Sequence, residues 1–157
     1  MKRYFVRTSL VVLILIAAGC SMVSGWISSS PPRTAIRKVS VIADALSNQG
    51  TGTELDLVFV YEATAAAQLP KTGPEWFTQK AALQAALATS IDVASVQVPA
   101  VASNFTVKLP DRASKAIAVY ALANYIGEGG QPIANLTPWR EVTIHLLPMT
   151  INYTGTF

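Results

Sequence analysis

Residues 55–62 read LDLVFVYE, and this stretch decides the fold class. Its centre is apolar at successive positions, as expected of a strand that is covered on both faces. Outward from it in both directions, apolar and polar residues alternate with the period of two that is typical of strands with one buried face. These further strand-like segments are residues 39–43, 104–109, 141–147 and 150–154. A mainly β protein is therefore predicted.

The alternation also predicts which side chains point into the core. His145 falls on the polar face of its strand, where a solvated side chain is expected. The run KAIAVYALANY at 115–125 has the alanine content of a helix, but its apolar cluster and the Gly-rich turn after it favour a long central strand. The side chains predicted to point inward are Phe105, Val107, Leu109, Val142, Ile144 and Leu146.

One segment, residues 74–88, departs from the strand pattern and predicts a short inserted helix. Pro74 occupies a favourable first position and Glu75 lies in the first turn. Trp76, Leu83 and Leu87 share one helical face, with Lys80 able to lay its stem along it. Seven or eight short strands separated by turn signals, with this one helix, predict a two-sheet β-sandwich.

The N-terminus has the pattern of an export signal. A basic start is followed by LVVLILIAA at 10–18, which is too short to span a membrane. Ala17-Ala18-Gly19-Cys20 resembles a bacterial lipobox, with alanine where leucine is usual at its first position. We therefore expect a signal peptide at 1–19, a lipidated flexible tether at 20–37 and a β-sandwich domain at 38–157. An ordinary signal peptide with a chance cysteine is the alternative.

Composition limits the partners that the mature chain can have. The chain has 157 residues, with 12 Lys and Arg against 9 Asp and Glu, but Lys2, Arg3 and Arg7 lie in the signal peptide. The mature charge is therefore near zero, which argues against nucleic-acid binding. A single cysteine rules out a multi-cysteine metal cluster and a single histidine argues against a His-rich one, so no metal site is predicted.

No pattern for catalysis is present in the sequence. Asp56 and Glu62 are six residues apart on one strand, about 20 Å, which is too far for a paired carboxylate mechanism. No nucleophile is accompanied by a base. We expect no enzyme activity and no cofactor other than the covalent lipid, such as palmitate, on Cys20. Export, acylation and a tethered β-domain point to a protein that holds a partner at a membrane.

The stretch from Val39 to Tyr61 resembles the outer-membrane lipoproteins of type VI secretion systems, the TssJ/SciN family. A first strand leads into the loop Asn48-Gln49-Gly50-Thr51-Gly52, and a second strand ends in Val-Tyr. Glu62-Ala63 departs from the family's polar-Leu pair. The helix with Trp76-Phe77 near its start is also similar to the family, as are residues 115–125 and Trp139-Arg140.

This resemblance implies a fold, a location and a partner. It implies a transthyretin-like β-sandwich anchored by acyl chains to the outer membrane and facing the periplasm; Ser21, in place of an aspartate, agrees with that membrane. It also implies binding to the periplasmic C-terminal region of the inner-membrane subunit TssM, within a larger trans-envelope membrane complex. The contact residues would be Asn48, Gln49, Gly50, Thr51 and Gly52.

Alternatives remain both for the contact segment and for the function. The segment 47–53 can equally be a plain hairpin connection. It lies outside the apolar pattern of the strands, so we expect truncation of Asn48 and Gln49 to spare folding. A periplasmic ligand-binding or carrier lipoprotein, or a pilotin-like outer-membrane assembly factor, are the alternative functions. A deep apolar pocket would favour the carrier.

Overall fold

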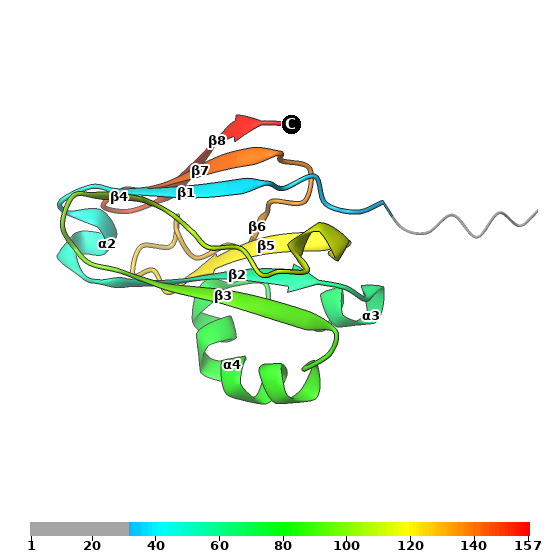
Figure 1. Ribbon diagram of the computed structural model, residues 1–157. Coiled ribbons are helices and arrows are strands. Elements are labelled where there is room, and N and C mark those ends of the chain that lie inside the picture. The colour runs from blue at the N-terminus through cyan, green and yellow to red at the C-terminus, as the bar shows by residue number, and fades with distance from the viewer. Residues whose placement is uncertain (1–31) are drawn as a thin grey trace, which may run out of the picture. The chain divides into compact units, whose positions relative to one another are not determined.

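The computed structural model describes residues 32–157, which form two four-stranded β-sheets. Figure 1 shows the sheets as two layers, with helix α4 on the outer side of the second one. The first sheet has the order β4-β1-β7-β8 and the second β3-β2-β5-β6. The elements are β1 (Lys38–Ala43), α2 (Ser47–Gly50), β2 (Thr53–Val60), α3 (Ala63–Ala66), α4 (Gly73–Ala86), β3 (Ile91–Val98), β4 (Ser103–Thr106), the 3-10 turn η1 (Ala113–Lys115), β5 (Ala118–Ala123), β6 (Ala134–Asn135), β7 (Glu141–Leu146) and β8 (Ile151–Thr156).

β1 and β2 are inner strands of different sheets. β1 runs parallel to β7 and antiparallel to β4. β2 is antiparallel to both β3 and β5. Because β1 and β2 belong to different sheets, the segment between them crosses from one layer to the other. The hairpin alternative for residues 47–53 is therefore wrong.

The two faces of β2 explain the unbroken apolar run in its sequence. Leu55, Leu57 and Phe59 point into the core between the sheets. Val58 and Val60 point the other way, into a second cluster beneath α4 that includes Trp76. Successive side chains of a strand alternate between faces, so burial of both faces requires apolar residues at successive positions.

The helix predicted at 74–88 is confirmed as α4, Gly73–Ala86. Thr72 caps its start, because the Thr72 hydroxyl accepts a hydrogen bond from the Glu75 N–H, and Pro74 lies in its first turn. Trp76 is fully buried against β2 and Leu83 packs against the same cluster. The predicted mainly β fold with two sheets and one inserted helix is confirmed.

The predicted core positions are confirmed in large part. Val107, Val142, Ile144 and Leu146 are buried, whereas Phe105 and Leu109 are half-buried and pack against the core. The strand predicted at 115–125 is shorter, since residues 113–115 form a 3-10 turn before β5. β3 and the two-residue β6 were not among the predicted ranges.

The folded domain begins before the predicted boundary at Lys38. Thr34 and Ile36 are buried, and the Thr34 N–H donates to the Ala116 carbonyl at 2.8 Å. The C-terminal limit predicted for the tether, residue 37, is therefore too late. The predicted signal peptide at 1–19, the acylated Cys20 and the rest of the tether to residue 31 lie outside the described residues. Within residues 32–157, no helix has the length and hydropathy needed to cross a bilayer.

A candidate partner-binding end of the sandwich

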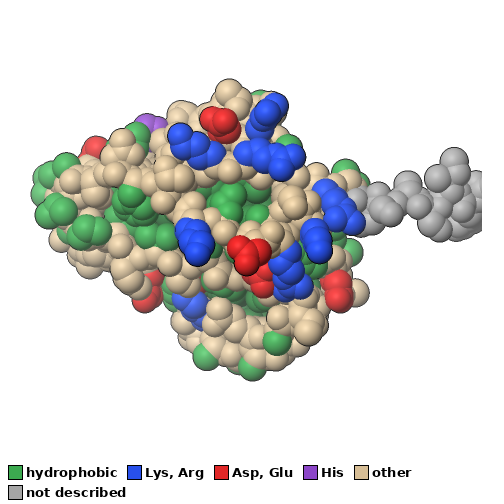
Figure 2. Space-filling view, viewed as in Figure 1, with side chains coloured by type: hydrophobic (Ala, Val, Ile, Leu, Met, Phe, Trp, Pro, Cys, Tyr) green, Lys and Arg blue, Asp and Glu red, His purple; other side chains and the backbone are tan. Residues whose placement is uncertain are grey.

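Four connections meet at one end of the sandwich, which we call the apolar end: residues 44–52, 99–102, 124–130 and 147–150. Hydrogen bonds join three of them, 44–52, 124–130 and 147–150, including Asn48 N–H to the Leu147 carbonyl at 3.2 Å, and Gly129 and Thr150 form an isolated bridge. Each connection exposes one large apolar side chain. These are Leu46, Val101, Ile126 and Met149, with 67%, 58%, 54% and 56% of their surface exposed. Figure 2 shows hydrophobic side chains gathered at this end, on the left of the view.

The predicted contact residues 48–52 lie in a tight turn at this end. Asn48 and Gln49 have positive φ angles, 50° and 57°, and Gly50 follows at 75°. Only glycine enters this left-handed region freely, with asparagine the next most tolerant, so Asn48 suits the turn better than Gln49. Three successive left-handed residues reverse the chain between the two sheets. The turn therefore depends on side-chain bonds to hold it.

Asn48 supplies those bonds, and this corrects the expected role of the residue. Its side chain is buried: Oδ1 accepts from the Ile126 N–H at 2.7 Å, and Nδ2 donates to the Asn124 carbonyl at 3.1 Å. Truncating Asn48 removes contacts within the fold, so the expectation that folding would be spared is wrong for this residue. Asn48 positions the turn from inside.

The remaining predicted contact residues are exposed. Gln49, Gly50, Thr51 and Gly52 form the outer edge of the turn. They follow the exposed Leu46 in the same connection. These four residues are exposed to solvent, whereas Asn48 is buried, and their contact with a partner stays a prediction.

Tyr125 holds the turn to the neighbouring connection. Its hydroxyl donates to the Leu147 carbonyl and accepts from the Asn48 N–H at 3.1 Å. Burial raises the pKa of this hydroxyl, so it stays protonated and can donate its proton to the Leu147 carbonyl. Gly130 packs against the Tyr125 ring so closely that a Cβ there would collide with it. The exposed apolar side chains thus project from a well-connected backbone.

The charge of the apolar end is slightly negative. Its four connections contain Asp44 and Glu128 but no lysine or arginine. Recognition at this surface must therefore depend on apolar contact and shape rather than on attraction by basic side chains. This agrees with the uncharged character of residues 47–53.

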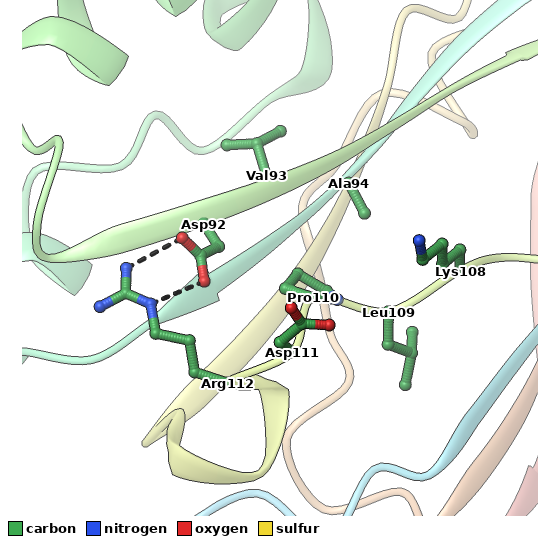
Figure 3. Close-up of a pocket in the computed structure, with 8 residues that line it drawn as sticks. All are labelled: Asp92, Val93, Ala94, Lys108, Leu109, Pro110, Asp111 and Arg112. Carbon is green, nitrogen blue, oxygen red and sulfur yellow. Dashed lines mark hydrogen bonds and ion pairs between the residues drawn. The ribbon is translucent and has the colours of Figure 1, made fainter.

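A separate charged cluster lies between β3 and the connection after β4 (Figure 3). Arg112 binds both carboxylate oxygens of Asp92, at 2.9 Å each, and lies 4.1 Å from the centre of the Tyr61 ring. The Tyr61 hydroxyl donates to the same carboxylate at 2.6 Å. The guanidinium, more than the tyrosine bond, holds the pKa of Asp92 below its ordinary value despite the opposing effect of burial.

This cluster borders an open hollow of about 480 Å³. The hollow is lined by Asp92, Val93, Ala94, Lys108, Leu109, Pro110, Asp111 and Arg112. Half of these residues are charged. Both oxygens of Asp92 are bonded to Arg112, so the ion pair joins β3 to the connection after β4. A ligand carrier would need a deep apolar pocket, and this open, partly charged hollow differs from such a pocket.

Asp56, which the sequence analysis placed too far from Glu62 for a paired carboxylate mechanism, is engaged inside the fold. It is buried beneath α4 and bonds to Trp76 and Lys80. His145 is half-buried, with Nε2 3.1 Å from the Thr154 hydroxyl. Among residues 32–157, no group of three His, Cys, Asp or Glu side chains is arranged to hold a metal ion.

The two sheets and the inserted helix form a β-sandwich fold that is similar to a solved structure of a type VI secretion lipoprotein. The T6SS lipoprotein TssJ1 from Pseudomonas aeruginosa superposes on the chain with a TM-score of 0.50 and 15% sequence identity, over 78% of this chain and 96% of TssJ1. Serratia marcescens Lip, a membrane-bound component of the Type VI Secretion System, gives a TM-score of 0.49 and 10% identity, over 80% of this chain and 100% of Lip. No protein-family model and no curated protein sequence matches the chain. The predicted resemblance to the TssJ/SciN family is confirmed at the level of the fold.

Proposed function

We propose that this chain is an outer-membrane lipoprotein of a type VI secretion system that binds the periplasmic C-terminal region of a TssM-like inner-membrane subunit. It acts as a scaffold, joining the two membranes within a trans-envelope complex. The observation that carries the partner-binding part is the apolar end, with four large exposed side chains around the turn at 47–52. The fold shared with TssJ1 supports the choice of system.

The apolar end has the features of a protein-binding surface. Clustered exposed apolar side chains on a water-soluble domain mark interaction sites, whereas single ones are ordinary. Here the backbone beneath them is held by the Asn48 and Tyr125 hydrogen bonds. A surface that is ordered before binding loses less conformational entropy when a partner covers it.

Attachment through the N-terminus agrees with a partner at the apolar end. Residues 32–37 lead into the sandwich at the end where β1 begins, and β1 then runs along its sheet to residues 44–52 (Figure 1). The apolar end is therefore opposite to the end at which the chain enters the domain. An anchor on Cys20 would therefore attach the domain at the end away from the apolar end.

Binding can be tested with paired substitutions. In Val101→Asp/Met149→Asp, two exposed apolar side chains become charged without touching the core, so the domain should stay folded. We expect affinity for the purified periplasmic C-terminal region of the cognate TssM-like subunit to fall at least about tenfold, which is 1.4 kcal/mol. Calorimetry on the acylated chain in detergent micelles measures this.

The matched control is Ala82→Asp/Ala85→Asp, which adds the same charge at exposed positions of α4. It should bind as the unchanged chain does. Equal binding by the Val101/Met149 variant would exclude the apolar end as the contact. If the unchanged chain does not bind its partner, the proposed function is itself wrong.

The anchor is tested separately through the only cysteine. Cys20→Ser removes the sulfur that would carry the acyl chains, so labelling with radioactive palmitate should disappear and the chain should leave the outer-membrane fraction. A variant that is recovered in the outer membrane as before would exclude acylation as the means of attachment.

A further inference from the structure

Basic side chains gather at the end of the sandwich opposite to the apolar end. We call this set the basic end: Arg33, Arg37, Lys38, Lys115 and Arg140, all of them exposed. Backbone pairing brings their segments together, because the Arg37 N–H donates to the Arg140 carbonyl at 2.7 Å and Thr34 pairs with Ala116 at 2.8 Å. Figure 2 shows Lys and Arg side chains from the middle of the molecule to the end where β1 begins, and none at the apolar end.

The charges at the basic end are not neutralised by close ion pairs. In the part of the chain that the structure describes, the two ion pairs are Lys80–Asp56 and Arg112–Asp92, and neither includes a member of the basic end. Three exposed acidic residues lie nearby: Glu62, Asp111 and Glu141. The five cations outnumber them, although the mature chain as a whole is near neutral. The domain is therefore electrically polar along its length.

The basic end follows the expected anchor closely in the chain, which points to the lipid surface as its partner. Pro32, the first described residue, precedes the basic end directly, and it follows Cys20 by 12 residues. A chain of that length reaches at most about 40 Å. An acyl anchor would thus keep the basic end close to lipid headgroups, at a high effective concentration. Exposed cations are attracted to anionic headgroups over roughly a Debye length, about 8–10 Å, and arginine bonds phosphate with a planar fork.

We propose that the basic end docks on anionic phospholipid headgroups of the membrane to which the chain is anchored. This inference rests on the anchoring part of the proposed function. Docking orients the domain, so that the apolar end faces away from that membrane. A flexible tether alone would leave the domain free to tumble, and the apolar end would then often face the lipid.

The test replaces the acyl anchor, so that it does not depend on Cys20. Residues 32–157 contain both sheets and both core clusters and so carry their own fold. An N-terminal hexahistidine tag attaches them to vesicles that contain nickel-chelating lipid. Because Cys20 is the only cysteine, Ser114→Cys gives a single labelling site beside Lys115. Energy transfer from this label to a headgroup acceptor reports how close the basic end lies to the surface.

We expect transfer to rise about twofold when phosphatidylcholine vesicles are replaced by vesicles with about 30% phosphatidylglycerol. The rise should disappear at about 1 M salt, where the Debye length is about 3 Å. A label placed instead through Ala102→Cys, at the apolar end, should show no rise. An equal signal on both kinds of vesicle, or a rise that is the same for both labels, would overturn the proposal.

Charge reversal supplies the matched comparison. Lys115→Glu/Arg140→Glu should abolish the rise. Lys71→Glu/Gln79→Glu/Ala82→Glu makes the same change in net charge at exposed positions on and before α4, and should keep it. If both variants lose the rise equally, net charge rather than the basic end is responsible and the proposal is wrong. Because this experiment contains no partner protein, its failure would not contradict binding to a TssM-like subunit. Failure of the TssM-like subunit to bind would likewise not contradict docking on lipid.

Discussion

The indole N–H of Trp76 on α4 donates to the buried carboxylate of Asp56 on β2 across 2.7 Å. Lys80, one turn further along the helix, places its ammonium 2.8 Å from the same carboxylate oxygen. The surrounding interface is apolar, formed by Val58, Val60 and other side chains of the second cluster. These two bonds therefore fix where α4 lies on the sheet, which apolar packing alone specifies less strictly.

Removing the lysine should destabilise the domain strongly. Lys80→Met keeps most of the stem but leaves the Asp56 carboxylate buried without its countercharge, so we expect the free energy of unfolding to fall by about 3–5 kcal/mol. Urea unfolding measures the change. Asp56→Leu/Lys80→Met, which removes both charges, should lose less than the single variant. Lys71→Met, at an exposed site, should change stability by less than about 0.5 kcal/mol.

Asn48 and Gln49 should respond very differently to truncation. Asn48→Ala leaves the Ile126 N–H and the Asn124 carbonyl without their side-chain partner, at about 1–3 kcal/mol of unfolding free energy. Gln49→Ala changes an exposed side chain and should stay within about 0.5 kcal/mol. Chemical denaturation of the two single variants tests this. Equal losses would show that the Asn48 bonds do not hold the turn.

The strands and most core positions were predictable because burial there follows the repeat of the local structure. A period of two marks β1 and β7, and the unbroken run in β2 reflects its two covered faces. β3 escaped prediction because it is an edge strand, and its sequence IDVASVQV does not alternate cleanly. Half of its residues are half-buried, and they fall on both faces, which leaves little contrast between the faces.

The structural roles of Asn48 and Asp56 were not predictable from the sequence. Asn48 bonds to residues 76 and 78 positions away, and Asp56 bonds to a tryptophan 20 positions away. A polar residue in a turn-rich segment is normally solvated, and only the tertiary fold brings up the groups that bury it. The cluster of exposed side chains at the apolar end was not predictable for the same reason, because they come from four separate connections that only the tertiary fold brings together.

Gly73 should tolerate no side chain. A Cβ at this position would lie 1.7 Å from the Ala123 carbonyl oxygen, which is backbone and cannot rotate away. Gly73→Ala must therefore push α4 off β5, and we expect a loss of at least about 1–3 kcal/mol in unfolding free energy. At Gly52 a Cβ meets only the Val98 carbonyl oxygen at 3.6 Å. Gly52→Ala is the matched control and should fold with nearly unchanged stability.

The Asp92–Arg112 pair should make stability depend on pH in the acid range. The Arg112 guanidinium keeps the pKa of Asp92 in the folded domain below its ordinary value of about 3.9. A lowered pKa means that the unfolded chain takes up the proton first as the pH falls. The contribution of the pair is therefore complete above about pH 4 and is lost as the pH falls through the lower, folded-state pKa.

Comparison with variants isolates this effect from other carboxylates. The difference in unfolding free energy between the unchanged chain and Asp92→Asn should be constant from about pH 7 to pH 5 and should shrink below about pH 4. Arg112→Gln removes the other partner of the same pair, and the difference in unfolding free energy between it and the unchanged chain should show the same pH dependence. Urea titrations at a series of pH values measure both. A difference that stays constant into acid would mean that Arg112 does not hold the carboxylate ionised, and that the pair joins β3 to the neighbouring connection through packing on Tyr61 alone.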